Sequence, residues 1–305
     1  MKRVSVLLAA AAATAVFTAP AYAWDGFGHR IVAQIAWDNM TPAARANAIQ
    51  LLRAASSNTR LLFPAQPGPL NDAQQQQQFL HASIWPDLIR GSSFDVPDRH
   101  FVNIFWRQQQ DFSTPQPLPG HAVTGMLLND LPRFATAVRN HQGSPAQRAI
   151  ELAWIIHLVG DIHQPLHSSA RVTPLDPNGD RGGGLFILAP EPHKVTLHNL
   201  WDQIVDRQEP RQGGETEDAY IRRLATAFEA RFPRNSFGAE INVISPTRWA
   251  QRSVEIAQQA VYRSPLVRGQ MPDVAGYQRP ALAVAEPRIA LAGYRLAELL
   301  NTILG

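Results

Sequence analysis

Histidine and aspartate recur four residues apart at two places in this chain. His157 and Asp161 form the first pair, and His198 and Asp202 form the second. On a helix such residues lie on one face about one turn apart, so each pair can hold one metal ion between an imidazole nitrogen and a carboxylate oxygen. The first pair lies in an apolar stretch, where isolated polar groups would be costly to bury. Together the two pairs predict metal binding rather than two hydrogen-bonded core pairs.

Three further residues extend this ligand set. His167 follows Pro165, which should end or distort the helix that carries His157 and so let His167 point elsewhere. Asp87 and His100 lie upstream; taken singly, they are equally consistent with a helix-terminal aspartate and an ordinary strand histidine. The chain contains no cysteine, which excludes zinc–thiolate sites. Nitrogen and carboxylate ligands without thiolate favour zinc, with manganese or iron as alternatives.

The N-terminal region predicts one more ligand. Residues 1–23 have the pattern of a secretory leader, with a basic start, an apolar stretch and a small-x-small cleavage site at Ala21-Tyr22-Ala23. Cleavage would place the protein in the periplasm or outside the cell and expose the α-amine of Trp24. That amine, with a pKa of roughly 7.7–8, and its adjacent carbonyl can chelate a metal, and His29 can fold back through a glycine-containing turn to join them. The alternative is that cleavage merely leaves a frayed terminus.

Composition limits the class of protein. Removing residues 1–23 takes two of the 28 basic residues and none of the 25 acidic ones, which leaves a formal charge of +1. The charge is therefore weak evidence for a basic nucleic-acid-binding surface. No second apolar run approaches the ~20 residues of a membrane span, so we expect a soluble mature protein without a membrane anchor.

Apolar periodicity predicts a mostly helical protein. Strand-like alternation is scarce: residues 100–106 are the best candidate and 185–188 a weaker one, while 64–72, 107–120 and 171–184 have loop composition. No repeat or long linker divides residues 24–305, so we expect one all-α domain. The predicted helices span residues 29–39, 42–55, 73–90, 121–141, 145–166, 196–208, 215–231, 246–263 and 279–303.

The order of these motifs resembles a secreted family of trinuclear-zinc nucleases and 3′-nucleotidases that act on single strands. The superfamily also includes bacterial zinc-dependent phospholipase C. The resemblance runs from Trp24 to about Asp202 and implies an all-α phospholipase C/nuclease fold with the zinc cluster in a deep cleft. Its motifs are Trp24 with His29, Trp85-x-Asp87, the His-Phe at His100, His157-x3-Asp161-x2-Gln164-Pro165-Leu166-His167, Gly182-Gly183 and His198-x3-Asp202.

The resemblance also implies how three zinc ions would be held. One ion would take Asp87, His100, His157 and Asp161; a second would take His167, His198 and Asp202; the third would take the amine and carbonyl of Trp24, with His29 and a bridging Asp161. Asp87 and Asp161 would position a hydroxide that bridges two zinc ions and attacks phosphorus. The implied activity is hydrolysis of single-stranded RNA and DNA, and of 3′-nucleotides, with 5′-phosphate products from the nucleic acids.

Two departures from the family pattern concern substrate binding. Gly184 stands where the family commonly has an asparagine that contacts base and phosphate, and the stretch after His100 lacks the acidic residues and lysine of several relatives. Arg181 or Arg107 could hold a phosphate instead, and Phe105 could stack on a base. The alternatives are surface arginines and core packing.

Two other functions remain open from the sequence. The same metals could serve a phospholipase C, or the protein could be a secreted zinc-binding protein without turnover. We expect a monomer.

Overall fold

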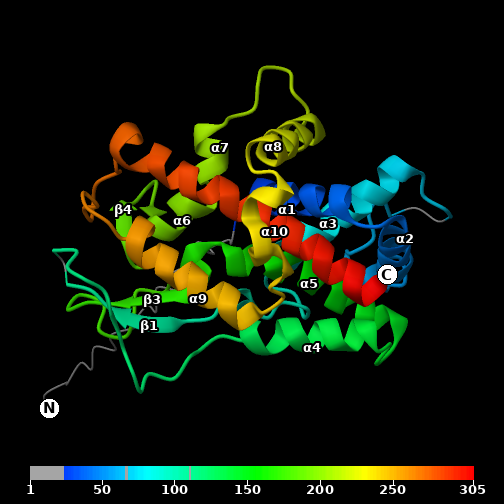
Figure 1. The fold of residues 1–305 in the computed structure, drawn as a ribbon, viewed down its shortest axis with the longest axis horizontal. Coiled ribbons are helices and arrows are strands. Elements are labelled where there is room, and N and C mark those ends of the chain that lie inside the picture. The colour runs from blue at the N-terminus through cyan, green and yellow to red at the C-terminus, as the bar shows by residue number, and fades with distance from the viewer. Residues whose placement is uncertain (1–23, 66–67, 110) are drawn as a thin grey trace, which may run out of the picture.

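Helices follow one another along most of the chain (Figure 1). The computed structural model describes residues 24–65, 68–109 and 111–305, so the predicted leader, residues 1–23, lies outside the described residues. The α-helices are α1 (Gly26–Asn39), α2 (Pro42–Leu52), α3 (Asp72–Leu88), α4 (Leu127–Arg139), α5 (Pro145–His163), α6 (Leu197–Asp202), α7 (Ile204–Gln208), α8 (Glu217–Arg231), α9 (Pro246–Ile256) and α10 (Arg279–Leu304).

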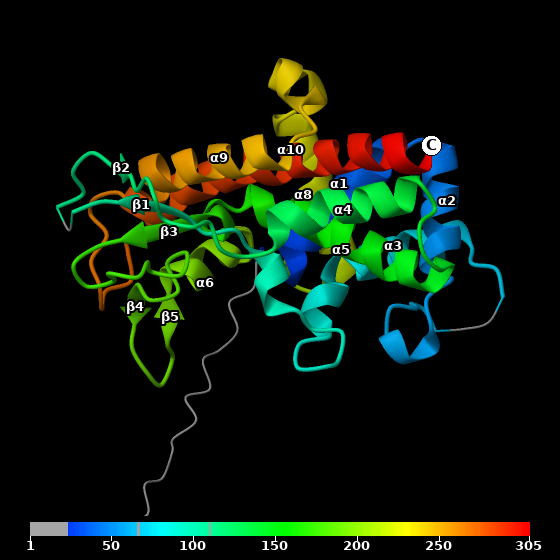
Figure 2. The ribbon, with the colours of Figure 1, turned by 90° about the horizontal axis from the view of Figure 1, so that it is seen from below.

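Short strands gather at one end of the molecule, near α6 and away from α2 and the C-terminus (Figure 2). In one sheet the order is β2-β1-β3, with β1 antiparallel to β2 and parallel to β3, and β4 pairs with β5 in another. The strands are β1 (Ile104–Arg107), β2 (Gln116–Pro117), β3 (Ser169–Val172), β4 (Ile187–Ala189) and β5 (Val195–Thr196). The prediction of an all-α single domain is confirmed, since these strands are few and short.

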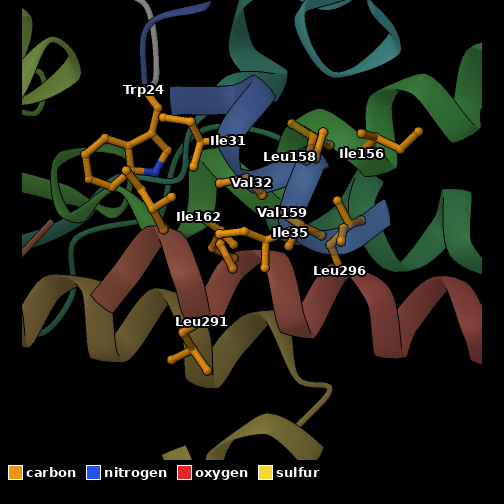
Figure 3. Close-up of a cluster of buried hydrophobic side chains, with 14 of the residues drawn as sticks. Trp24, Ile31, Val32, Ile35, Ile156, Leu158, Val159, Ile162, Leu291 and Leu296 are labelled. Carbon is orange, nitrogen blue, oxygen red and sulfur yellow. The ribbon is translucent and has the colours of Figure 1, made fainter. Parts of the chain in front are cut away.

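The main core lies where α1, α5 and α10 meet (Figure 3). Ile35 of α1, Val159 of α5 and Leu296 of α10 are fully buried there, and Trp24 packs into the same cluster. Each such side chain contributes roughly 1.5–3 kcal/mol when it leaves water. This packing fixes the start of α1 against the C-terminal half of α5.

Side-chain caps define the helix starts that matter for the candidate ligands. Asp25 caps α1 by accepting hydrogen bonds from the amides of Phe27 and Gly28. Thr196 and Asn199 form a capping box at α6, which carries both His198 and Asp202. The expected helix starts at Thr41-Pro42 and Ser144-Pro145 are also confirmed.

Several predicted boundaries were wrong. Helix α4 begins at Leu127 rather than 121, because Thr124 bridges to Asn103 and the Met126 amide donates to Asp98 O. The predicted helix 196–208 is divided at Gln203 into α6 and α7, and α9 continues beyond Ile256 as a π-helical turn. The strand predicted over 100–106 is shorter, since His100 ends a 3₁₀ turn and β1 starts at Ile104.

The region after α5 follows the prediction made from Pro165. Helix α5 ends at His163, and a 3₁₀ turn, Pro165–Ser168, carries His167 in a different direction from His157. The glycine-containing turn expected before His29 is not present among the described residues. Gly26 and Gly28 instead belong to the first turn of α1, which also carries His29.

Candidate metal centre

Eight histidine and aspartate side chains from separate elements converge at the buried end of α5. Each of them is at most 9% exposed. Helix α5 supplies two of them, and the rest come from α1, α3, the 3₁₀ turns around His100 and His167, and α6. They are His29, Asp87, His100, His157, Asp161, His167, His198 and Asp202.

Asp161 lies at the centre of the first group. Its Oδ1 is 3.2 Å from Nε2 of His29. Its Oδ2 is 3.2 Å from Nδ1 of His100 and 3.3 Å from Nε2 of His157. Asp87 approaches from α3, with Oδ2 4.0 Å from Nε2 of His157. The two oxygens of one carboxylate therefore face two different sets of histidines, which is the arrangement of a bridging ligand.

His167, His198 and Asp202 form a separate group. Nε2 of His198 lies 3.0 Å from Nε2 of His167 and 3.5 Å from Oδ2 of Asp202. Two further groups share His157: one adds His29 and Asp161, and the other adds Asp87 and His100. The described residues thus offer three sets of ligand atoms that could each hold a metal ion.

Backbone carbonyls fix the tautomers of three of these histidines. Nδ1 of His157 lies 2.7 Å from Ser83 O, Nδ1 of His167 lies 2.6 Å from His100 O, and Nδ1 of His198 lies 2.7 Å from Gly182 O. A carbonyl only accepts, so each Nδ1 carries the proton in the neutral ring and each Nε2 presents a lone pair. The Nε2 atoms of His167 and His198 thus face each other as two acceptors, an arrangement that a cation between them would stabilise.

Buried polar atoms without hydrogen-bond partners concentrate at the same place. They include both ring nitrogens of His29, Nε2 of His100, and one carboxylate oxygen each of Asp87, Asp161 and Asp202. A buried polar atom without a partner costs about 1–3 kcal/mol, so such a cluster needs another explanation. Nitrogen and carboxylate donors around metal ions explain it, and the residues present fit a metal cluster of this kind.

Comparison with known proteins gives the family. A model described as S1/P1 Nuclease matches residues 24–305. The chain belongs to the S1/P1 nuclease family. It is 23% identical to Nuclease S1 of Aspergillus oryzae over 97% of both chains, and 23% identical to Nuclease P1 of Penicillium citrinum over 92% of this chain and 98% of that one. It is also 29% identical to Endonuclease 5 of Arabidopsis thaliana, in a match that spans 59% of this chain and 60% of that one.

Membership of the S1/P1 nuclease family makes this protein a nuclease, with nucleic acids as its substrates. No helix in the described ranges is long and apolar enough to cross a membrane.

Trp24 is held beside the candidate centre. Its side chain is fully buried, and the amide of the next residue, Asp25, donates to Asp202 O at 3.0 Å. A Cβ at Gly28 would stand 2.6 Å from Trp24 Cβ, so glycine permits this close packing in the first turn of α1. The cleavage site that would free its amine lies among residues outside the described ranges.

Three residues support the candidate ligands in roles that were not predicted from the sequence, although Gln164 stands in one of the motifs named above. Arg90 donates through Nε and a terminal nitrogen to Oδ1 of Asp87, at 3.2 and 2.8 Å. Gln164 donates to Oδ1 of Asp202 at 2.7 Å. Gly160 leaves room for His29, since a Cβ there would stand 2.7 Å from the ring's Nδ1. Arg90 could have been found from its i+3 spacing to Asp87, and Gln164 from its place between Asp161 and His167.

Burial and neighbouring charges shift the pKa values of the candidate ligands in different directions. Burial, with His157 nearby, lowers the pKa of His29 to about 4, so its ring is neutral at pH 7. Burial raises the pKa of Asp161, but His157 and the hydrogen bonds from neighbouring histidines outweigh burial and hold this pKa well below its usual value. Burial raises the pKa of Asp202 well above its usual value, and a nearby cation would reverse that shift.

The candidate substrate residues lie in different environments. Arg107 and Arg181 are exposed, and Arg181 has a positive φ of 54° in the loop before the glycines. Phe105 is half-buried, with its ring 5.4 Å from that of His121. Gly184 is half-buried, and a Cβ there would meet only Arg181, at 3.1 Å from its carbonyl oxygen.

Proposed function

We propose that this nuclease is zinc-dependent and hydrolyses single-stranded RNA and DNA to 5′-phosphate products, with 3′-nucleotidase activity. The observation that carries the proposal is Asp161, whose two oxygens face His29 on one side and His100 with His157 on the other. Family membership supports the same reaction class, hydrolysis of nucleic acids.

Three zinc ions are proposed, with the ligand sets that the motifs imply. Asp87, His100, His157 and Asp161 would hold one, and His167, His198 and Asp202 another. His29, Asp161 and the backbone amine and carbonyl of Trp24 would hold the third. When bound, zinc would lower the pKa of water in the site toward about 7 and stabilise negative charge on phosphoryl oxygens.

The chain's own residues would prepare this site for a phosphodiester. Asp87, Asp161 and Asp202 contribute three negative charges, so three divalent ions would leave the centre strongly cationic inside a nearly neutral protein. Carbonyls of Ser83, His100 and Gly182 keep three rings oriented, which limits reorganisation during the reaction. Arg90 holds Asp87, and Gln164 holds Asp202.

Substrate recognition is proposed for four further residues. Arg181 and Arg107 would contact phosphate, Phe105 would stack on a base, and Gly184 would leave space where the family asparagine would reach the substrate. Single-strand preference would follow, because a base must leave the duplex stack to enter a buried centre.

We also propose that the leader is removed before Trp24, that the mature protein of residues 24–305 is periplasmic or secreted, and that it is a monomer. The family match begins at residue 24, which supports this boundary.

One experiment tests the function. Protein beginning at Trp24 is assayed for metal content and, with and without chelator, for hydrolysis of single-stranded RNA and DNA, duplex DNA, 3′-AMP and phosphatidylcholine. The expected result is about three zinc ions per chain and chelator-sensitive release of 5′-nucleotides from single strands. Hydrolysis of phosphatidylcholine alone, or zinc without turnover, would overturn the proposal.

A further inference from the structure

A buried polar network lies behind the glycine loop, residues 181–184. Asp180, which precedes this loop, is fully buried. Tyr262 donates its hydroxyl to Oδ2 of Asp180 at 2.5 Å, and the Arg171 amide donates to Oδ1 at 3.0 Å. The Arg171 guanidinium lies beside both partners, with Nε 3.8 Å from Oδ2 of Asp180 and Cζ 4.2 Å from the centre of the Tyr262 ring. Three groups from two other segments thus surround this carboxylate, and two of them hydrogen-bond to it.

The glycine loop connects this network to His198. Gly182 O accepts the hydrogen bond from Nδ1 of His198, and Gly183 O accepts one from the His198 amide at 3.4 Å. Gly182 and Gly183 have φ of 58° and 78°, which glycine adopts without strain. A Cβ at Gly183 would stand 3.3 Å from the Tyr262 hydroxyl. The same Cβ would stand 3.3 Å from the His198 amide nitrogen, so the loop packs closely against both Tyr262 and His198.

The orientation of His198 depends on where this loop lies. Nδ1 of its ring hydrogen-bonds to a carbonyl, and that carbonyl belongs to a residue two positions after Asp180. His157 and His167 take their carbonyl partners from Ser83 and His100, in other parts of the chain. A change in the Asp180–Tyr262 contact would therefore alter the orientation of His198 and leave His157 and His167 in place.

We propose that Asp180 and Tyr262 are positioning residues for the metal group His167–His198–Asp202: they fix the Gly182 carbonyl, which orients His198. The inference rests on the proposed function, because it assumes that this group holds a metal ion. A group that hydrogen-bonds a metal ligand typically contributes 10- to 100-fold to metal affinity. Here that group is the Gly182 carbonyl, so displacing it through Asp180 or Tyr262 should have a measurable effect.

The network is also part of the core, so its loss will lower the free energy of unfolding whether or not it affects metal binding. If the role were limited to the core, substitution would lower the affinity for all three metal ions equally or for none of them. If the residues position His198, substitution lowers the affinity for one ion and leaves the affinities for the other two unchanged. Tyr294 offers a matched control, because it is a buried tyrosine whose hydroxyl donates to Phe232 O at 3.1 Å.

The test compares Tyr262→Phe, Asp180→Asn and Tyr294→Phe in zinc-loaded protein beginning at Trp24. Zinc ions per chain are counted by native mass spectrometry during stepwise chelation, and unfolding by urea is measured after chelation. We expect Tyr262→Phe to lower the affinity of one ion by about 10- to 100-fold and to leave the other two unchanged. Tyr294→Phe should change unfolding alone. If Asp180→Asn fails to fold, Tyr262→Phe still decides, since it removes a single oxygen.

A second comparison locates the affected ion. In a His167→Ala background the group is already broken, so adding Tyr262→Phe should not weaken the two remaining ions further. Three unchanged affinities in Tyr262→Phe, or an equal loss in all three, would overturn the inference while leaving the nuclease proposal intact. Wild-type protein that binds no zinc would instead overturn the proposed function, and the inference with it.

Discussion

His29 and Asp161 lie 3.2 Å apart, Nε2 to Oδ1, although one lies in the first turn of α1 and the other in the last turn of α5. The contact joins the start of the described chain to the centre of the ligand cluster. His29 lies one turn after Asp25, and the Asp25 amide donates to Asp202 O, so the same turn of the chain lies against both ligand groups. The position of Trp24 and the geometry of the candidate centre are thus coupled.

Gly160→Ala should displace His29. A Cβ at this position would stand 2.7 Å from Nδ1 and 2.9 Å from Cε1 of the ring, closer than side chains pack. Alanine favours a helix by about 0.8–1 kcal/mol over glycine, so α5 should still form. We expect one zinc ion to be lost and nuclease activity to fall at least about tenfold. Gly26→Ala is the control, since its Cβ would meet only Ile84 at 3.9 Å; equal metal content in both variants would contradict the prediction.

An added residue before Trp24 should remove one ion. The proposed chelate uses the free α-amine of Trp24, and an amide in its place has no lone pair to donate. We compare protein beginning at Trp24 with protein beginning at an extra alanine, by metal content and by hydrolysis of single-stranded DNA. The extended protein should bind two ions and lose most activity. Full activity with three ions would exclude N-terminal chelation.

Arg90→Met should lower the affinity for the metal ion that Asp87 is proposed to hold. The substitution removes both hydrogen bonds to Oδ1 and leaves a buried carboxylate with fewer partners, a cost of about 1–3 kcal/mol. It also removes one of the charges that, together with the nearby histidines, outweigh burial and lower the pKa of Asp87. Chelator competition should show about a tenfold or greater loss for one ion. Arg133→Met, which breaks a pair with Asp130 elsewhere, should leave all metal affinities unchanged.

Metal binding should stabilise the protein more at pH 8 than at pH 5.5. Burial lowers the pKa of His157, but Asp161 and Asp87 outweigh it and raise this pKa above 6.5 in the metal-free protein. Stability from that protonated ring is present below pH 6.5 and is lost as the pH rises through the raised value. A metal takes the neutral ring, so protons compete with it in acid. The difference in Tm between zinc-loaded and chelated protein should therefore grow with pH; a difference that shrinks would contradict the assignment of His157.

The sequence by itself determined the chemistry of the centre and most of the helices. Helical periodicity and capping are local properties, so the starts at Pro42 and Pro145 and the end of α5 before Pro165 could be predicted. The i, i+4 spacing placed His157 with Asp161 and His198 with Asp202, and both pairs lie together in the fold. The absence of cysteine limited the ligands to nitrogen and oxygen donors.

Only the tertiary structure decided how these ligands are shared and held. The packing of α1 against α5 assigns one oxygen of Asp161 to His29, and no spacing along the chain contains that information. The carbonyls that orient His157, His167 and His198 belong to distant residues, because backbone acceptors have no sequence signature. The Asp180–Tyr262 network was missed for the same reason: its partners lie far apart along the chain, and local residue patterns do not encode such contacts.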